Sequence, residues 1–165
     1  MTHYSILNTA AMGDLLLMTD GSLLTGVYFM GREHAPTVPP AWRRNPSHPV
    51  LALAAEQIPA YLAGQRTDFT VPLAESGTTF QREIWRQIAL IPFGQTITYT
   101  ELARRAGNPR AVRAAGTATG LNPLSIVVPC HRVIGEDGTP RGYAGGLDRK
   151  QRLLALEKSW PLGKK

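Results

Sequence analysis

Residues 98–109 read Thr98-Tyr99-Thr100-Glu101-Leu102-Ala103-Arg104-Arg105-Ala106-Gly107-Asn108-Pro109. Thr98 followed by Glu101 is typical of a helix N-terminus, and Gly107-Asn108-Pro109 predicts a short turn that ends the helix. A further helix is expected from about Arg110. Two short helices joined by a Gly-containing turn have the outline of a helix-turn-helix. Helical hairpins of this length also form for packing reasons alone, so the outline by itself assigns no function.

The second helix of this pair is thin. Arg113 is followed by seven small residues, Ala114 to Gly120, which offer little bulk for a core. Such a helix can approach another surface closely, whether a neighbouring helix or a nucleic-acid groove. Upstream, Thr78 and Gln81 form a capping-box pattern that predicts one more helix, whose apolar stripe comprises Phe80, Ile84 and Ile88.

The first thirty residues alternate between apolar and polar side chains, as strands do. Strands are expected at Tyr4–Leu7, Leu15–Met18 and Leu23–Phe29, with turns at Gly13-Asp14 and Asp20-Gly21. Short strands separated by such turns predict an antiparallel meander.

A proline-rich segment follows the meander. Residues 35–50 contain five prolines and favour an extended, exposed loop. A helix is expected over Pro49–Leu62, kinked at Pro59, and one more strand over Thr67–Val71. We therefore predict an α+β protein with an N-terminal α/β domain over residues 1–75 and a mostly helical domain over residues 76–165.

The net charge of +6 is unevenly divided. Residues 1–75 hold four Arg and six acids, a net charge of −2, whereas residues 76–165 hold fourteen Lys or Arg and six acids, a net charge of +8. A basic half attracts a polyanion, usually nucleic acid, although basic helices can also be solvated faces. No basic helix carries bulky apolar residues opposite, as a membrane-surface helix would. Without a leader-like or membrane-spanning segment, a cytoplasmic location is expected.

The chain contains a single cysteine, in Pro129-Cys130-His131-Arg132-Val133-Ile134. It follows the apolar run Ser125–Val128, which is strand-like, and precedes an imidazole and a guanidinium. Such neighbours lower the pKa of a thiol and make it nucleophilic. A lone cysteine is also often a small buried apolar residue. We interpret Cys130 as a nucleophile, because His131 and Arg132 are rarely buried without partners.

The cysteine belongs to a longer motif, Asn122-Pro123-x-x-Ile126-x-x-Pro129-Cys130-His131-Arg132-Val133-Ile134. Four further motifs precede or follow it: Gly77-Thr78-x-Phe80-Gln81-x-x-Ile84-Trp85, Ile91-Pro92-x-Gly94-x-Thr96-x-x-Tyr99-x-x-Leu102-Ala103, Arg113-x-x-Gly116 and Gly142-Tyr143-x-Gly145-Gly146. In these motifs and in their order, the sequence from Gly77 to Lys158 resembles the O6-alkylguanine-DNA alkyltransferases, also called methylated-DNA–protein-cysteine methyltransferases. The resemblance implies a ribonuclease H-like N-terminal domain and a winged-helix-like C-terminal domain.

The resemblance also implies an irreversible alkyl transfer from O6-alkylguanine in DNA, and from O4-methylthymine, to Cys130. His131 would act as the base through a water, and Glu157 on an exposed last helix would orient the imidazole. Asp148 is expected to cap that helix, which would run from Arg149 to Lys158. Tyr99 would donate a hydrogen bond to the ring N3 of the extruded base.

The remaining site residues are also implied by the resemblance. Arg113 would fill the space left in the duplex by the flipped nucleotide, and Ala114, Gly116 and Thr117 would lie in the minor groove. The base pocket would be lined by Ser125, Val133, Tyr143 and Ala144. Asn122 would tie the recognition helix to the cysteine loop. Departures from the common family pattern, expected at the DNA face or the pocket wall, are Ala115, Thr119 and Leu121.

Three functions remain open at this point: stoichiometric alkyl transfer, non-catalytic binding of alkylated DNA to recruit other repair proteins, and a cysteine hydrolase that uses Cys130, His131 and Glu157. The cysteine argues against the second, and the basic half is unexplained by the third. The expected partner is double-stranded DNA with alkylated bases, bound by a monomer or cooperatively. No cofactor and no metal are expected, because the four histidines are scattered along the chain.

Overall fold

The computed structural model describes residues 1–158 and confirms the α+β class. The chain forms two compact units. The first comprises Met1–Glu75 together with Pro123–Val127, and the second comprises Ser76–Asn122 together with the chain from Val128 onward. The return of Pro123–Val127 to the first unit is a feature that the sequence did not indicate.

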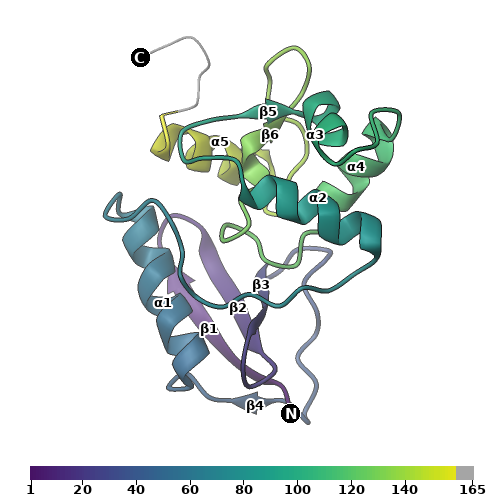
Figure 1. Ribbon diagram of the computed structural model, residues 1–165. Helices are drawn as coiled ribbons and strands as arrows, with labels where there is room; N and C mark the ends of the chain where they lie inside the picture. The colour runs from purple at the N-terminus through teal and green to yellow at the C-terminus, as the bar shows by residue number, and fades with distance from the viewer. Residues whose placement is uncertain (159–165) are drawn as a thin grey trace. The chain divides into compact units, whose positions relative to one another are not determined.

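The first unit is built on an antiparallel meander, as predicted (Figure 1). Strand β2 (Gly13–Thr19) pairs with β1 (His3–Thr9) on one side and with β3 (Leu24–Phe29) on the other. Gly13 was expected in a turn, but it is the first residue of β2, where it pairs with Thr9 of β1.

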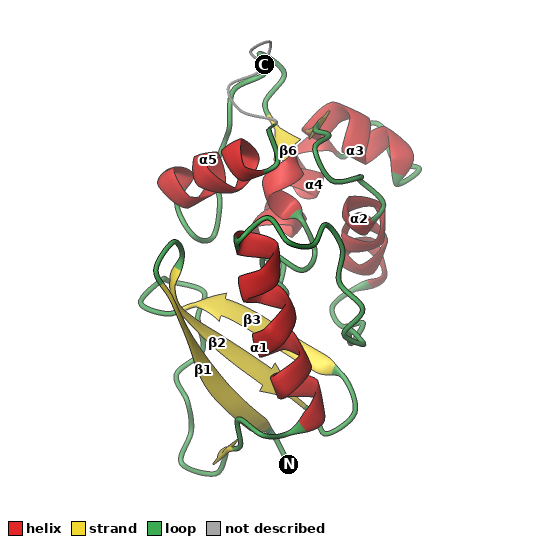
Figure 2. Ribbon diagram, turned by 90° about the vertical axis from the view of Figure 1, so that its left-hand side faces the viewer, coloured by secondary structure: helices red, strands yellow, loops and turns green. Residues whose placement is uncertain are grey.

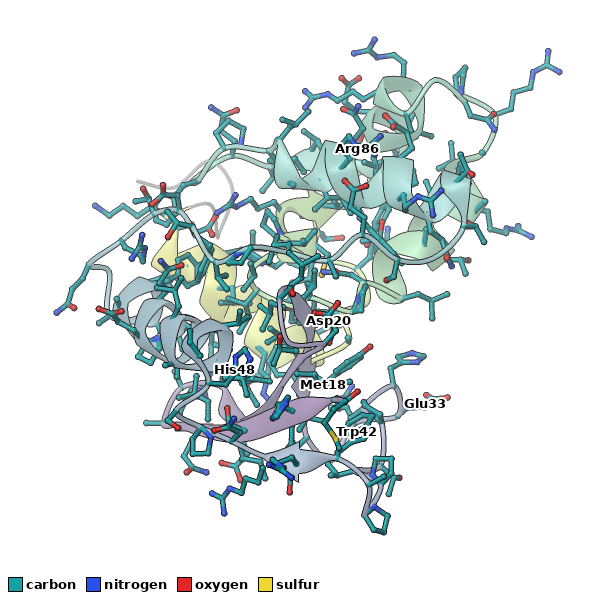
Figure 3. All side chains as sticks on the ribbon, turned by 60° about the horizontal axis from the view of Figure 1, so that its bottom comes forward. Met18, Asp20, Glu33, Trp42, His48 and Arg86 are labelled. Atoms are coloured by element: carbon teal, nitrogen blue, oxygen red, sulfur yellow. The ribbon has the colours of Figure 1, made fainter. Side chains whose placement is uncertain are left out.

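The proline-rich segment is not entirely irregular. Strand β4 (Arg43–Arg44) pairs in parallel with β1 and completes the sheet order β3-β2-β1-β4. The pairing is fixed by two backbone N–H groups: Arg43 donates to the carbonyl of Thr2 at 3.0 Å, and Asn45 donates to that of Tyr4 at 2.9 Å. Trp42, which directly precedes this strand, is labelled in Figure 3. The prediction of a plain loop missed this strand because its partner is some forty residues away in the sequence.

Helix α1 (Pro49–Leu62) has the predicted bounds and packs on the sheet (Figure 2). His48 caps it, since its Nδ1 accepts a hydrogen bond from the N–H of Val50 at 3.2 Å, and Pro49 suits the first helical position. The kink expected at Pro59 stays a prediction. The helix buries one face, formed by Leu51, Ala54, Ile58 and Tyr61, against a sheet whose fully buried residues include Leu15, Leu16 and Leu17.

The strand expected at Thr67–Val71 is wrong. A buried side chain takes the place of a neighbouring strand there: Oε1 of Gln57 accepts hydrogen bonds from the N–H groups of Thr70 at 2.9 Å and Val71 at 3.3 Å. Two residues beyond Val71, Leu73 forms an isolated parallel bridge with Leu24 of β3.

The strand expected at Ser125–Val128 is also wrong, because this apolar run forms turns. The N–H of Val127 donates to the carbonyl of Ser125 at 2.8 Å, and Ile126 has a φ of 72°. A left-handed conformation is strained for a β-branched residue. The segment is nevertheless anchored, since Val27 of β3 exchanges backbone hydrogen bonds with Pro123 and Ser125 at 2.8 and 3.1 Å.

The second unit is mostly helical. Helices α3 (Tyr99–Arg105) and α4 (Val112–Gly120) pack on each other and on α2 (Thr79–Ala89). A two-stranded parallel sheet pairs β5 (Ile97–Thr98) with β6 (Val133–Ile134). The 3-10 helix η1 (Cys130–Arg132) directly precedes β6, and α5 (Leu147–Leu156) is the last described helix.

The predicted capping box of α2 is confirmed. Oγ1 of Thr78 accepts from the N–H of Gln81 at 3.1 Å, and the Gln81 side chain accepts from the N–H of Thr78 at 2.9 Å. Gly77 precedes it with a φ of 82°, and a Cβ there would lie 2.6 Å from Oε1 of Gln81. Arg86 lies on the exposed side of α2, where it pairs with Glu83 (Figure 3).

Helix α5 differs from its prediction at both ends. It begins at Leu147 behind Gly146, and Asp148 lies inside its first turn, where it pairs with Arg152 at 3.3 Å instead of capping the helix. It ends at Leu156, so Glu157 is its C-cap residue. No helix within residues 1–158 is long and apolar enough to cross a membrane.

The Gln57 side chain provides a test of the first unit. Gln57→Ala removes the acceptor of two backbone N–H groups, that of Val71 buried and that of Thr70 part-buried, which we expect to cost about 2–3 kcal/mol of the free energy of unfolding. Urea denaturation measures this loss. Gln65→Ala, at an exposed position after the same helix, is the control and should change stability by less than about 0.5 kcal/mol. Equal effects of the two variants would contradict the structural role of Gln57.

Candidate active site

Cys130 lies at the start of η1 and is 3% exposed. Its own N–H donates to the carbonyl of Val128 at 2.8 Å, which fixes the turn. Asn122, which follows α4, donates from Nδ2 to the same carbonyl at 2.9 Å and to the Cys130 sulfur at 3.2 Å. One buried amide therefore links the end of α4 to the cysteine turn and also touches the sulfur.

Burial raises the pKa of the Cys130 thiol above its usual value. Three smaller effects lower the pKa: the hydrogen bond from Asn122, the positive charge of Lys150 and a hydrogen bond from the backbone N–H of Cys130 itself. Adjacent cationic and imidazole groups were expected to lower the thiol pKa, but desolvation is the larger effect. Cys130 is therefore a thiol at neutral pH and needs a way to lose its proton during reaction.

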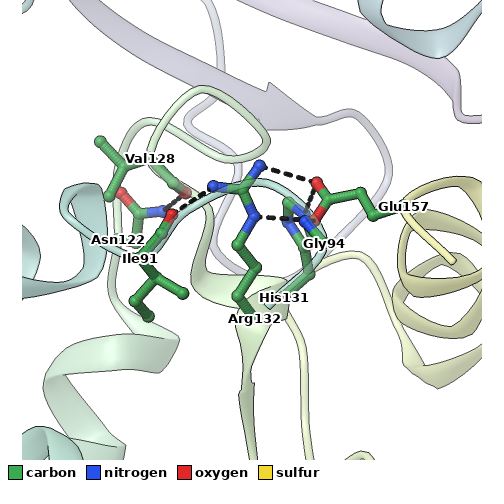
Figure 4. A network of polar contacts seen from close by, with 7 residues as sticks. All are labelled: Ile91, Gly94, Asn122, Val128, His131, Arg132 and Glu157. Atoms are coloured by element: carbon green, nitrogen blue, oxygen red, sulfur yellow. Dashed lines mark hydrogen bonds and ion pairs between the residues drawn. The ribbon is translucent and has the colours of Figure 1, made fainter. Parts of the chain in front are cut away.

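His131 and Glu157 form a buried pair, with His131 Nε2 2.9 Å from Oε2 of the carboxylate (Figure 4). Both side chains are fully buried. Taken alone, an acidic residue on an exposed helix would be a surface charge, but Glu157 is the C-cap residue of α5 and is buried. The structure thus brings the two predicted residues together, and a carboxylate at this distance can fix the orientation of an imidazole.

Arg132 is a member of this network that the sequence analysis left without a role. Its Nε and Nη2 donate to the two oxygens of Glu157, each at 2.8 Å, and its Nη1 donates to the carbonyl of Ile91 at 2.6 Å (Figure 4). The N–H of Gly94 also donates to Glu157, at 3.2 Å. A bidentate guanidinium is the strongest kind of partner for a buried carboxylate.

The pKa of His131 is lowered, first by burial and further by the charges of Arg132 and Lys150, against the opposing effect of Glu157. The imidazole is therefore neutral at pH 7. A neutral imidazole can accept a proton, as a base for Cys130 must.

Tyr99 begins α3, directly after β5, and its side chain is largely buried. Burial, and then the negative charge of a Cys130 thiolate, raises the pKa of Tyr99 to about 12. The phenol is thus an O–H donor at neutral pH. Helix α4 passes close to it, since a Cβ on Gly116 would lie 3.8 Å from the ring.

The predicted recognition helix presents a distinct exposed face. Arg113, Ala114 and Thr117 are exposed on α4, and Gly116 is partly exposed. Beside this face lies an open groove of about 570 Å³, bounded by the start of α2 and lined in part by Arg110 and Arg113. Three residues were expected to alter the DNA face or the pocket wall. Of these, Leu121 is 42% exposed, whereas Ala115 and Thr119 are buried in the core.

The residues expected to line the base pocket do not all lie in the same unit. Val133 follows η1 and is fully buried, and the Tyr143 ring lies edge-on to His131 with centroids 6.4 Å apart. Ala144 is next to Tyr143 in the loop before α5. Ser125 belongs to the first unit, where its N–H donates to Val27, so its predicted contact with a base stays a prediction.

The sequence analysis missed Lys150 as well as Arg132. Lys150 is fully buried, and Nζ donates to backbone carbonyls instead of lying in solvent as lysines usually do. The signal available in the sequence was weak: Lys150 is one of several cations on an amphipathic helix, and only its inward position distinguishes it. No three His, Cys, Asp or Glu side chains among residues 1–158 are grouped to hold a metal ion.

The contribution of Arg132 to stability can be compared with that of an arginine in an exposed ion pair. Arg132→Met leaves the Glu157 carboxylate buried without its guanidinium, which we expect to cost about 3–5 kcal/mol of unfolding free energy. Arg104→Met removes an exposed partner of Glu101 on α3 and should cost less than about 1 kcal/mol. Thermal and urea denaturation measure both. Similar losses of stability in the two variants would contradict the conclusion that Arg132 is the main partner of the buried Glu157 carboxylate.

Comparison with known proteins identifies the group to which this chain is similar. Residues 79–159 match the family described as 6-O-methylguanine DNA methyltransferase, DNA binding domain. A methylated-DNA–protein-cysteine methyltransferase of Mycolicibacterium paratuberculosis is 46% identical over 89% of this chain and 87% of its own length. One from Methanosarcina acetivorans is 44% identical over 95% and 99%.

Solved structures agree with the sequence relatives. The crystal structure of Mycobacterium tuberculosis OGT in complex with DNA matches with a TM-score of 0.86 and 42% identity, and covers 95% of this chain and 93% of the other. The O6-methylguanine methyltransferase of the same organism matches with a TM-score of 0.84 and 41% identity over 99% and 97%. With its single cysteine in a Pro-Cys-His-Arg turn of the same fold, this chain belongs to the methylated-DNA–protein-cysteine methyltransferases.

Proposed function

We propose that the protein repairs DNA directly, by transferring a methyl or larger alkyl group from O6 of guanine to the sulfur of Cys130. The observation that supports this most is the placement of the only cysteine, whose sulfur receives a hydrogen bond from Asn122 and which directly precedes the buried His131–Glu157 pair. The family relationship adds the substrate class. The same chemistry would extend to O4-methylthymine.

In the proposed step the Cys130 sulfur forms a bond to the alkyl carbon while the bond from that carbon to O6 breaks. The electron pair of the broken bond leaves with guanine. The thiol proton passes through a water to His131, which later releases it to solvent, and the departing guanine anion takes up one proton from solvent, so charge and atoms balance. Tyr99, protonated at neutral pH, would donate to the departing base.

The product of this step limits the protein to one turnover. A thioether has no ionisable proton and is a poor leaving group, so none of the residues described provides a route back to the thiol. The protein would therefore act stoichiometrically, with one molecule consumed for each lesion.

DNA binding is assigned to the second unit. Helices α3 and α4 would act as a helix-turn-helix in a winged-helix-like domain, with the small exposed residues of α4 against the minor groove and Arg113 in the place of a flipped nucleotide. The net charge of +8 over residues 76–165 suits contacts to phosphates, which provide affinity without sequence preference. A monomeric state and cooperative binding stay predictions.

The transfer itself is tested with a duplex that carries one O6-methylguanine. Mass spectrometry of the protein after incubation should show one added methyl group, confined to the peptide with Cys130. Cys130→Ala should lose all transfer and retain DNA affinity, because the sulfur is not needed to hold the duplex. A wild-type protein that binds the lesion but stays unmodified would refute alkyl transfer and favour a non-catalytic binding module.

The role of Arg113 is tested by DNA affinity. Arg113→Ala should weaken binding to the lesion duplex at least about fivefold, or about 1 kcal/mol, because it removes both a cation and the side chain proposed to fill the duplex. Arg66→Ala changes the net charge equally but lies in the first unit, where Arg66 pairs with Asp68 at 3.8 Å. Fluorescence anisotropy compares the two. Equal weakening would show that only net charge matters.

A further inference from the structure

Two histidines of the first unit lie against each other where β1 and α1 begin. The rings of His3 and His48 have centroids 5.3 Å apart and are tilted by 35°. Both side chains are half-buried, so protons from solvent reach them. An imidazole changes its charge between about pH 5 and 8, so this pair can respond to pH. The proposed function uses neither residue.

The position of His48 requires an unprotonated nitrogen. Its Nδ1 accepts a hydrogen bond from the N–H of Val50 at 3.2 Å and thereby caps α1. A proton on Nδ1 would abolish this bond, because an imidazolium has two donors and no acceptor. It would also place a positive charge at the helix N-terminus, where the macrodipole is already positive. The first turn of α1, Pro49 to Ala52, is uncharged and does not offset such a charge.

The surroundings of His3 also disfavour a proton. Its Nδ1 lies 3.4 Å from Nδ2 of Asn45, a donor that favours an unprotonated ring nitrogen. Desolvation lowers the pKa of His3, and the charges of His48, Arg43 and the amino group of Met1 lower it further.

The acidic side chains of the neighbouring elements act elsewhere. The residue of β2 that pairs with His3 is the uncharged Thr19. Asp20, the next residue along the chain, lowers its own pKa by interaction with the amino group of Met1. The first acid of α1 is Glu56, about two turns inside the helix. The charged groups that act on His3 are therefore all cations.

The pair lies where β4 and α1 are joined to β1. The N–H of Arg43 donates to the carbonyl of Thr2 at 3.0 Å, and the N–H of Asn45 donates to that of Tyr4 at 2.9 Å. The N–H of His48 in turn donates to the carbonyl of Asn45 at 3.0 Å. One hydrogen-bonded segment thus connects the cap of α1 to β1. Because β4 is the last strand of the sheet, this segment also covers the outer edge of β1.

We propose that His3 and His48 form an acid-sensitive clasp: the neutral pair holds β4 and the cap of α1 on β1, and protonation releases this segment and uncovers the outer edge of β1. Since the pKa of His3 is lower in the folded protein than its ordinary value of 6.5, the unfolded chain binds more protons, and stability decreases as the pH falls below 6.5. The proposal does not rest on the proposed function, because both histidines belong to the first unit.

The test replaces each histidine by a residue that does not take up a proton. His3→Gln keeps a polar side chain of similar size, and His48→Asn keeps a side-chain acceptor at the N-cap, where Asn is among the most favourable residues. His34→Gln is the matched control, because His34 is exposed in the same unit. Thermal denaturation of the full chain at pH 7.5 and at pH 5.5 gives the loss of Tm for each protein.

Between these two pH values we expect the wild-type Tm to fall by about 2–4 °C more than that of the double variant, as loss of one helix cap would in a chain of this length. Each single variant should show an intermediate loss, and His34→Gln the wild-type loss. Other groups that take up protons, such as the buried His131, are present in every variant and cancel in the comparison. A double variant that is folded at pH 7.5 and loses as much Tm as the wild type would overturn the proposal.

Hydrogen exchange in the wild-type protein tests the clasp without any substitution. The N–H groups of Arg43, Asn45 and Val50 form the bonds that the clasp is proposed to hold. After correction for the intrinsic exchange rate, their protection should fall at least about fivefold between pH 7.5 and pH 5.5. The amides of the β2–β3 ladder should lose less. Unchanged protection of the three amides, or a loss no larger than that of the β2–β3 ladder, would overturn the proposal.

Discussion

The carboxylate of Glu157 is the interaction on which the site of the second unit depends. It accepts hydrogen bonds from Arg132 at both oxygens and from the N–H of Gly94, and it lies within hydrogen-bonding distance of His131. These groups come from η1, from the loop between α2 and β5, and from the end of α5. A carboxylate buried without such partners would be very costly. Glu157 can therefore be buried only while η1, the loop between α2 and β5 and the end of α5 are packed together.

In this arrangement the charge of Glu157 is balanced by one residue and the imidazole that Glu157 orients belongs to another. Arg132 provides the charge that balances the carboxylate, which leaves His131 neutral while it is still oriented by Glu157. The positive charge of Lys150 lowers the pKa of the Cys130 thiol, against the larger effect of burial. The thiol is thus kept protonated by burial at rest, yet lies among groups that lower the cost of ionisation when a substrate is in place. Such a resting thiol is protected from adventitious oxidation or alkylation, because the thiolate is the reactive form.

Local signals predicted the elements that depend on nearby residues. The capping box at Thr78 and Gln81, the bounds of α1 and the meander all follow from patterns within a few residues, and they are confirmed. The two wrong strands are apolar or β-branched runs, for which burial in a turn and burial in a strand give the same pattern. Pairs distant in sequence were missed, as were the inward positions of Arg132 and Lys150, since one sequence does not show which of many cations points into the core.

More of the residues that the structure brings together were named by resemblance than by chemistry alone. The motif around Cys130 suggested a nucleophile and a histidine, and the resemblance named Glu157 and Asn122, which the structure places at the imidazole and at the sulfur. From the residues alone Glu157 would have been placed on an exposed helix surface, because no nearby pattern indicates that the C-cap residue of α5 is buried.

The short return of Pro123–Val127 to the first unit has a consequence for how that unit is completed. Strand β3 lies at the end of the sheet, and its outer edge is occupied by Pro72 and Ala74, which bond Leu24, and by Pro123 and Ser125, which bond Val27. An uncovered edge strand is a template for association with other chains. The first unit therefore becomes safe from edge-to-edge aggregation only after the chain has been synthesised beyond residue 125, so the emerging N-terminal half is at risk while the helical half is still being made.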